Sequence, residues 1–425
     1  MGPYEPSFQQ PSQLFSLVSF NIQSFAKSYQ DMASDAPTDL PSDNSEITLV
    51  PARCHCSSNS FLVPFRKADL PIKADACNCN SCRHATGTMA VVAVRMAGAP
   101  FRPDGAGAGG ENVKEGELQR ADLSGLSTYN VSNALTRYFC ASCGCYMLYK
   151  SSHSDGADAT WSVSAGVLER VEGIFKVGWH SYVGDTLDGG FADHYRVQDA
   201  VELPRYLGDV DEPGKQTVPS GWKAERLVEK LKHKSSYSGT GEEDERLAVY
   251  CQCRQVSLSI KRETGVPAPQ HWWHVGGKNG EKVRYMTGYC ACNDCRLSSG
   301  SIFTPYLFAM RQNVIDNRTN EPIQLVFDSD SASQPPCLKT YGSSPNTYRS
   351  FCSTCGACVL YYKTSREGGE LLDVSVGLVD EVEEGSRAER WLFWYGKVSH
   401  SQGGIDKEGI FTLEEGLRLT HAVPK

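Results

Sequence analysis

The residues best able to do chemistry in this chain are cysteines, which recur at short, repeated spacings. The segment "DACNCNSC" holds Cys77, Cys79 and Cys82, and "GYCACNDC" repeats the spacing at residues 290–295. Sulfurs this close together bind a metal ion or exchange disulfides. The N-terminus has no basic residue before Lys27, so no secretory signal is evident. In a reducing compartment such clusters hold metal more often than they form disulfides.

Each copy of this triplet is accompanied by a Cys-x-Cys before it and a Cys-x-x-Cys-Gly after it. Structural zinc takes four tetrahedral ligands, whereas catalytic zinc has three protein ligands and one exchangeable position. Seven cysteines per copy therefore divide into a four-cysteine site and a three-cysteine site, which predicts two Zn²⁺ per copy and up to four per chain. The four-cysteine sites are Cys54, Cys56, Cys140 and Cys143, then Cys251, Cys253, Cys352 and Cys355; the three-cysteine sites are Cys77, Cys79 and Cys82, then Cys290, Cys292 and Cys295.

A zinc ion with three thiolates leaves one position for a soft ligand such as a substrate thiolate. The alternative is that both metals are structural and that an extra cysteine completes the second site. Cys145 and Cys358 lie two and three positions after Cys143 and Cys355, so strand alternation turns them to opposite faces. The pattern therefore favours open three-cysteine sites, and Cys337 is expected to be a bystander thiol.

Residues next to the triplets have competing interpretations. Arg83 and Arg296 directly follow them, where a guanidinium would offset the charge of three thiolates on zinc or bind a substrate carboxylate. A solvated surface arginine is the alternative. His84 is a ligand or proton carrier, or, more commonly, a surface histidine. Gly87 and Gly300 are expected to permit turns.

The repeated pattern indicates a duplicated domain of roughly 200 residues. "YFCASCGCYMLY" is answered by "SFCSTCGACVLY", and the second copy has an insertion containing "HWWH" at residues 271–274, expected to anchor a loop through its rings. Segments rich in β-branched and aromatic residues predict mainly antiparallel strands, with metal supplementing each core. The predicted organisation is a disordered tail at 1–47, a first zinc domain at 48–207, a linker with a short helix near 222–232 at 208–246, and a second zinc domain at 247–425.

Composition narrows the class of protein. The formal net charge of −8 works against nucleic-acid binding, which needs clustered Lys and Arg. No window approaches the roughly 18 uninterrupted apolar residues of a membrane span. We therefore expect a cytoplasmic protein, with a nuclear location as the alternative, and no membrane partner.

The order of the motifs resembles a known family. Cys-x-Cys, then Cys-x-Cys-x-x-Cys-Arg with a nearby glycine, then Phe-Cys-x-x-Cys-Gly is similar to the glutathione-dependent formaldehyde-activating family, which includes centromere protein V; the resemblance covers roughly 48–207 and 247–415. It implies a β-tent fold, a closed structural zinc in each domain, and a second zinc at the triplet that the sulfur of glutathione approaches. The implied reaction forms or breaks a carbon–sulfur bond, as when glutathione condenses with formaldehyde to S-hydroxymethylglutathione.

Members of the family often carry a histidine in an aromatic or apolar segment, which His180 in "VGWHSYVGDTLDGG" matches; the second copy has no histidine at the corresponding place. The first domain is therefore favoured for activity. The predicted function is a zinc-dependent carbon–sulfur lyase of the S-(hydroxymethyl)glutathione synthase type, acting on an adduct of glutathione or another small thiol through the two triplets, Arg83, Arg296 and His180. The alternatives are a non-catalytic zinc-binding interaction module and a thiol redox protein.

Overall fold

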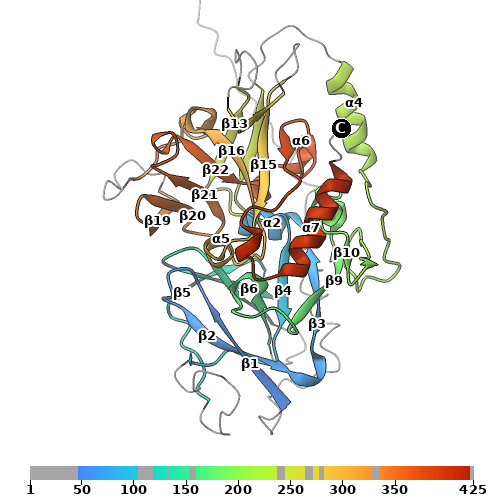
Figure 1. Cartoon of the computed structure of the whole chain (residues 1–425), viewed down its shortest axis with the longest axis vertical. Helices are drawn as coiled ribbons and strands as arrows, with labels where there is room; N and C mark the ends of the chain where they lie inside the picture. Colours follow the sequence, from blue (N-terminus) through green and yellow to red (C-terminus); the bar gives the residue numbers. More distant parts are fainter. Residues whose placement is uncertain are drawn as a thin grey trace, which may run out of the picture.

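The computed structural model describes residues 46–103, 118–132, 134–152, 159–236, 245–263, 271–276, 282–327 and 336–421. Within these ranges the chain forms two domains rich in β-strands, joined by a segment that carries the helix α4 (Glu225–Ser236) (Figure 1). This helix begins a little later than the sequence suggested. The predicted tail lies outside the described residues up to position 45.

The first domain contains a hairpin and a larger sheet. The seven-stranded sheet has the order β5-β6-β7-β8-β4-β3-β9, and every neighbouring pair is antiparallel except β3 with β9. The elements are β1 (Ile47–Arg53), β2 (Ser60–Arg66), β3 (Ile72–Cys77), α2 (Asn80–Thr86), β4 (Val91–Arg95), β5 (Leu126–Asn130), β6 (Leu135–Cys140), β7 (Tyr146–Ser151), β8 (Thr160–Ser164), β9 (Phe175–Ser181), α3 (Gly190–His194), β10 (Val197–Gln198) and β11 (Val201–Glu202).

The second domain repeats this plan with additions. Its large sheet runs β14-β15-β16-β22-β21-β20-β19, with β23 pairing in parallel on β15, and a second sheet runs β12-β13-β17-β18. The prediction of a mainly antiparallel β protein with two tandem domains is confirmed. The elements are β12 (Arg246–Tyr250), β13 (Ser257–Lys261), β14 (His274–Val275), β15 (Arg284–Cys290), α5 (Asn293–Ser299), β16 (Thr304–Met310), β17 (Val314–Asp316), β18 (Glu321–Pro322), β19 (Leu338–Ser344), β20 (Thr347–Cys352), β21 (Cys358–Lys363), β22 (Leu371–Ser375), α6 (Glu381–Glu384), β23 (Leu392–Trp394) and α7 (Lys407–Thr420).

Strand alternation in β15 decides which side chains reach the second three-cysteine site. Tyr285 and Tyr289 are buried in the core, whereas Met286, Gly288 and Cys290 alternate with them and are only half-buried. Because successive side chains of a strand point to opposite faces, Cys290 shares its face with Met286 and Gly288. This face becomes the floor of the cleft described below.

The two domains pack through equivalent segments and share one continuous hydrophobic core. The backbone N–H of Gly166 donates to Gly300 O at 3.0 Å, and in the equivalent contact the N–H of Gly377 donates to Gly87 O at 3.1 Å. Gly87 and Gly300 each end a helix with φ of 80°, a left-handed conformation that favours glycine, as the sequence predicted. Contacts that repeat in both directions characterise a two-fold interface, so the chain packs like a covalently joined dimer.

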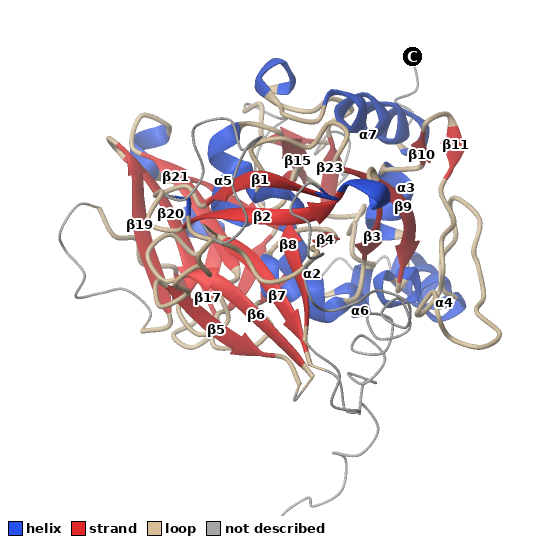
Figure 2. Ribbon diagram, turned by 90° about the horizontal axis from the view of Figure 1, so that it is seen from below, coloured by secondary structure: helices blue, strands red, loops and turns tan. Residues whose placement is uncertain are grey.

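The longest helix of the second domain, α7, lies against α3 of the first domain (Figure 2). Thr420 Oγ1 donates to Asp193 O at 2.7 Å, and the Nε2 atoms of His194 and His421 are 2.8 Å apart. A Cβ at Gly416 would lie 1.9 Å from His194 O, so this helix position requires glycine. Among the described residues, no helix is long and apolar enough to cross a membrane.

Candidate metal and substrate sites

Four cysteine side chains converge at one site in each domain. Two come from the turn after β1 or β12, and two from the end of β6 or β20 and the turn that follows. Neighbouring sulfurs lie 3.4–3.6 Å apart where they are in contact, close to the roughly 3.8 Å edge produced by Zn–S bonds of about 2.3 Å. These sets fit a structural zinc ion: Cys54, Cys56, Cys140 and Cys143, and Cys251, Cys253, Cys352 and Cys355.

Each three-cysteine site forms where a strand meets a short helix. Cys77 ends β3, Cys79 is the N-cap of α2, and Cys82 lies in the first turn of that helix. The sulfur of Cys79 accepts a hydrogen bond from the backbone N–H of Cys82 at 3.3 Å. The Cys-x-x-Cys spacing therefore places one cysteine at the N-cap and the other at the residue whose backbone N–H the cap sulfur accepts.

The second domain builds the same unit at β15 and α5. Cys290 ends the strand, Cys292 caps the helix, and the N–H of Cys295 donates to the cap sulfur at 3.4 Å. In both domains the three sulfurs lie within 4.8 Å of one another. The residues present therefore fit a zinc ion that has three protein ligands and an exchangeable position.

Two arginines that the sequence analysis did not single out reach the triplets. Arg137 on β6 donates to Cys82 Sγ at 3.3 Å, and Arg349 on β20 lies 3.7 Å from Cys295 Sγ. A sequence signal existed, because each arginine stands three residues before the first cysteine of the Cys-x-x-Cys pair, in "RYFCASC" and "RSFCSTC". A buried guanidinium beside each triplet stabilises thiolate charge.

The arginines that directly follow the triplets lie elsewhere. Arg83 is fully buried and donates to Glu381 Oε2 at 2.9 Å, across the domain boundary. Arg296 is also buried and donates to the carbonyls of Gly166 and Leu168 at 2.7 and 2.9 Å. The surface-arginine interpretation is therefore wrong, and both guanidinium groups already have partners in the contact between the domains.

The two histidines predicted near the first triplet are also enclosed. His180 lies on β9 with Nε2 2.7 Å from Tyr195 O, and burial lowers its pKa to about 3. His84 is buried, stacks on Tyr250 with ring centroids 4.2 Å apart, and places Nδ1 2.7 Å from Tyr250 O. Neither imidazole has a cysteine among its hydrogen-bond partners, and the surface interpretation of His84 is wrong.

The two triplets differ in their access to solvent. In the first domain Cys77, Cys79 and Cys82 are 3%, 7% and 0% exposed and pack among apolar side chains. In the second domain Cys290 and Cys292 are only half-buried, and all three cysteines line a cleft of about 710 Å³. This volume lies within the range of small-molecule sites.

One strand position accounts for part of that difference. Asp75 stands two residues before Cys77, where the second domain has Gly288 two residues before Cys290. The carboxylate of Asp75 accepts a hydrogen bond from Ser181 Oγ at 2.5 Å and occupies this face of the strand. At Gly288 an added Cβ would contact only Tyr395 Cβ, at 3.6 Å, so the cleft extends over the strand there.

Charged groups line the inner wall of the cleft. Arg366 donates to Asp373 Oδ1 at 2.6 Å, and the guanidinium groups of Arg349 and Arg366 lie 4.7 and 5.2 Å from the ring centre of Tyr361. Burial raises the pKa of Asp373 to about 7, against the opposing effect of Arg366. The site therefore combines cationic groups, an acid that titrates near neutral pH, and aromatic walls.

The "HWWH" segment has two functions in the fold. Trp273 is buried and stacks on His271 with ring centroids 4.3 Å apart, which is the anchoring expected from the sequence. Trp272 instead lines the cleft and meets Phe308 edge-to-face at 4.9 Å. Among the described residues, His271 and His274 belong to no group that could hold a metal.

The three remaining cysteines lie outside the candidate metal groups of the described residues. Cys145 is buried beside the four-cysteine site. Burial raises its pKa, and the nearby charges of Cys54 and Cys140 raise it further. Cys358 is buried near Arg349 and Cys295, and burial raises its pKa. Cys337 donates to the carbonyl of Gln255 at 2.9 Å. Cys145 and Cys358 thus neighbour different kinds of site.

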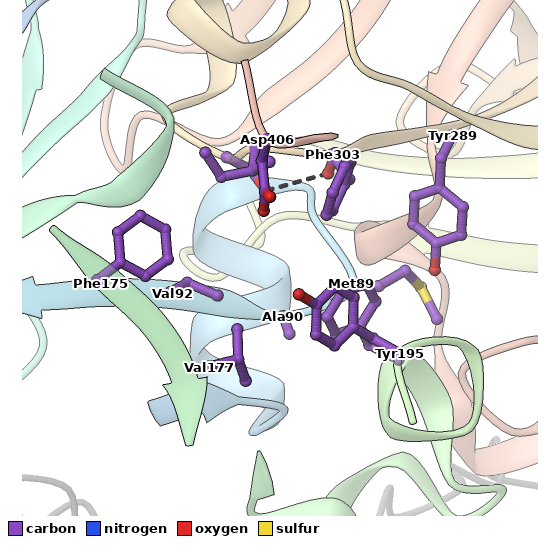
Figure 3. A pocket seen from close by; sticks show the side chains of 12 residues that line it. Met89, Ala90, Val92, Phe175, Val177, Tyr195, Tyr289, Phe303 and Asp406 are labelled. Carbon is purple, nitrogen blue, oxygen red and sulfur yellow. Dashed lines mark hydrogen bonds between the residues drawn. The ribbon is translucent and has the colours of Figure 1, made fainter. Parts of the chain in front are cut away.

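A second cavity lies between the domains and is lined mainly by apolar side chains such as Met89, Val177 and Phe303 (Figure 3). Ser301 Oγ donates to Phe303 O at 3.0 Å in its wall. Its volume of about 20 Å³ is enough for a single water molecule. This cavity is too small for a substrate and contains no cysteine.

Comparison with known proteins agrees with the duplicated pattern. The family model described as glutathione-dependent formaldehyde-activating enzyme matches residues 49–185 and 279–396, more than half of the chain. The first segment contains all seven paired and tripled cysteines of its domain, whereas the second begins after Cys251 and Cys253. No curated protein and no solved structure matches the chain.

Proposed function

Because the chain belongs to the glutathione-dependent formaldehyde-activating enzyme family, we propose that it is a zinc-dependent carbon–sulfur lyase acting on an adduct of glutathione or another small thiol. Family membership and the cysteine clusters support a zinc-binding enzyme of the formaldehyde-activating family. The reaction proposed is that of an S-(hydroxymethyl)glutathione synthase. The observation that carries the proposal is the cleft that opens onto Cys290, Cys292 and Cys295.

The proposal assigns the reaction to the second domain. The sequence favoured the first domain because of His180, but that imidazole is enclosed and hydrogen-bonded to Tyr195 O. The second domain has Val398 directly before Ser399, as His180 precedes Ser181, and it has the accessible triplet. We therefore assign the reaction to the domain whose triplet is accessible rather than to the domain that has the histidine.

The chemistry follows from the groups around the triplet. Zinc held by the three cysteines would supply a soft positive centre that keeps a substrate sulfur deprotonated at neutral pH. Arg349 lies 3.7 Å from Cys295 Sγ, where its guanidinium stabilises the thiolate of Cys295 and adds positive charge to the site. Burial raises the pKa of Tyr306 well above its usual value, so its hydroxyl keeps its proton and accepts a hydrogen bond from Arg349 Nη1 at 3.4 Å.

The reaction balances without an external oxidant or reductant. In the direction of addition, the thiol loses its proton, the sulfur electron pair forms the C–S bond to the carbonyl carbon, and the carbonyl oxygen takes up a proton. In the reverse direction the hydroxyl proton leaves, C=O forms, and the C–S electron pair returns to sulfur. The described residues at the triplet need only hold the sulfur and stabilise charge.

The proposal is tested by the rate at which free formaldehyde exchanges with S-hydroxymethylglutathione, measured by ¹³C exchange NMR on the zinc-loaded full chain. We expect exchange at least about tenfold faster than the spontaneous reaction, a modest acceleration for a thiolate-stabilising site. Protein that keeps zinc at the four-cysteine sites but has lost it from the triplets should return the spontaneous rate. A fully zinc-loaded chain that leaves the rate unchanged would contradict the proposed function.

A further inference from the structure

The cleft at the second triplet offers more apolar surface than a formaldehyde adduct requires. Its rim includes Trp272 and Tyr395, which are 54% and 48% exposed. Phe308 supports Trp272 edge-to-face at 4.9 Å, so the indole is held rather than free to turn away. Large aromatic side chains that are exposed at the rim of a concave site typically become buried when a ligand binds there.

The floor of the cleft is open between these rings. Gly288 carries no side chain, and a Cβ there would meet only Tyr395 Cβ at 3.6 Å. Met286, two residues earlier on the same face of β15, adds a flexible apolar side chain. In the first domain the equivalent positions are Lys73 and Asp75. At these two strand positions the floor beside the second triplet is therefore apolar, whereas the first domain has charged residues there.

The cleft also carries positive charge. Lys363 lines the cleft; its backbone carbonyl accepts a hydrogen bond from the N–H of Arg366 at 2.9 Å, and among the described residues its side chain forms no ion pair. Arg366 lies close by in sequence and is paired with Asp373 at 2.6 Å. A ligand that matches these groups has an anionic end near Lys363, a large apolar end against Trp272, and a sulfur at the triplet.

Resting on the proposed function, we propose that the second domain acts on the adduct of an anionic thiol with an aromatic carbonyl compound, rather than on the formaldehyde adduct alone. The ring of the substrate lies against Trp272 and Phe308, and a carboxylate of the thiol lies near Lys363. The bond made or broken is the same C–S bond. The electron pair goes to sulfur as C=O forms and the hydroxyl proton leaves, so no further reactant is needed.

The test compares two stable conjugates, S-benzylglutathione and S-methylglutathione, by isothermal titration calorimetry on the zinc-loaded full chain. We expect the benzyl conjugate to bind about tenfold more tightly, because its ring buries apolar area against aromatic walls. Trp272→Ala should remove most of that tenfold difference and change the affinity of the methyl conjugate by less than about twofold. Since Trp272 is exposed, the variant is expected to fold.

A matched control is Phe411→Ala, which removes an aromatic ring that is 69% exposed on α7 and outside the cleft. It should change neither affinity. Equal affinity for both conjugates, with no effect of Trp272→Ala, would overturn this inference and leave the proposed function intact, because the methyl conjugate still binds. Failure of both conjugates to bind would overturn the inference together with the glutathione-binding part of the proposed function.

Discussion

The two three-cysteine sites have the same local fold and different surroundings. In both domains a strand ends in cysteine, a second cysteine caps the helix, and a third lies in the first turn. Around this unit the first domain has Asp75 and Ala93 where the second has Gly288 and Tyr306. The metal ligands are therefore duplicated while the access of solvent to each triplet depends on the neighbouring strand positions.

The largest effects are expected at the four-cysteine sites, where the domains do not differ. Cys140→Ser and Cys352→Ser each remove one sulfur from a buried set of four. Because structural zinc contributes on the order of 10 kcal/mol to folding, both variants should fail to give folded protein, whereas the control Cys337→Ser should fold normally. The measurement is thermal unfolding together with zinc content, and normal unfolding of either ligand variant would contradict the structural assignment.

The two arginines beside the triplets should separate activity from stability. Arg349→Met should lower kcat/KM about 100-fold, the size of effect seen when a group stabilising charge is removed from an active site. Arg137→Met removes the equivalent contact with Cys82 and a hydrogen bond to Ser81 O at 3.0 Å. It should lower stability by about 1–3 kcal/mol and leave kcat/KM within about twofold. Equal losses of activity would show that both triplets work.

The acid in the second cleft should give a pH-dependent difference in stability. Burial raises the pKa of Asp373 to about 7, above its unfolded value, so the folded chain holds this proton more tightly. Stability contributed by the protonated form is present at low pH and is lost as the pH rises towards about 7. The difference in unfolding free energy between the wild type and Asp373→Asn should therefore decrease, by on the order of 2 kcal/mol, as the pH rises from 5 to 8.

Urea unfolding of zinc-loaded protein measures this difference. The matched control in the first domain is Ser162→Ala, at the strand position equivalent to Asp373. Its stability difference from the wild type should not change with pH. A pH-independent effect of Asp373→Asn would mean that the carboxyl group is ionised throughout this range.

The smallest effect is expected from exchanging the residues at the strand position two before the first cysteine of each triplet. Gly288→Asp places the residue of the first domain on the floor of the cleft and should raise KM about tenfold, because it fills space and adds negative charge near the thiolates. Asp75→Gly should leave KM within about twofold. Steady-state kinetics of both variants measure this, with Gly288→Ala as the intermediate case; an unchanged KM for Gly288→Asp would show that substrate does not cross this floor.

The cysteine groups could be predicted from sequence because chelation imposes short, repeated spacings, and the structure brings together the same fourteen cysteines. The roles of Arg83 and Arg296 could not be predicted from the sequence. In a helix the residue after a ligand is rotated by about 100°, which turns both guanidinium groups towards the other domain. Arg137 and Arg349 reach the triplets only because β6 and β20 cross near them in the folded chain.

The fold class could also be predicted, since β-branched and aromatic alternation is a local signal. The helix α7 was missed because its sequence contains Gly409 in the first turn and Gly416 in the interior, and a glycine in a helix interior costs about 1 kcal/mol. Close contact with His194 explains the second glycine, and that contact is tertiary. Whether a triplet is accessible is likewise decided by distant segments, including the insertion that carries Trp272.

We infer that the second triplet is the working site, and paired variants of the two helix-capping cysteines test this inference. Cys292→Ser and Cys79→Ser each keep an N-cap oxygen and remove one sulfur from a triplet. In the formaldehyde exchange assay, Cys292→Ser should fall to the spontaneous rate while Cys79→Ser retains at least about half of the activity, since only the second triplet is accessible. Loss of activity in Cys79→Ser with full activity in Cys292→Ser would show that the first triplet is the working site.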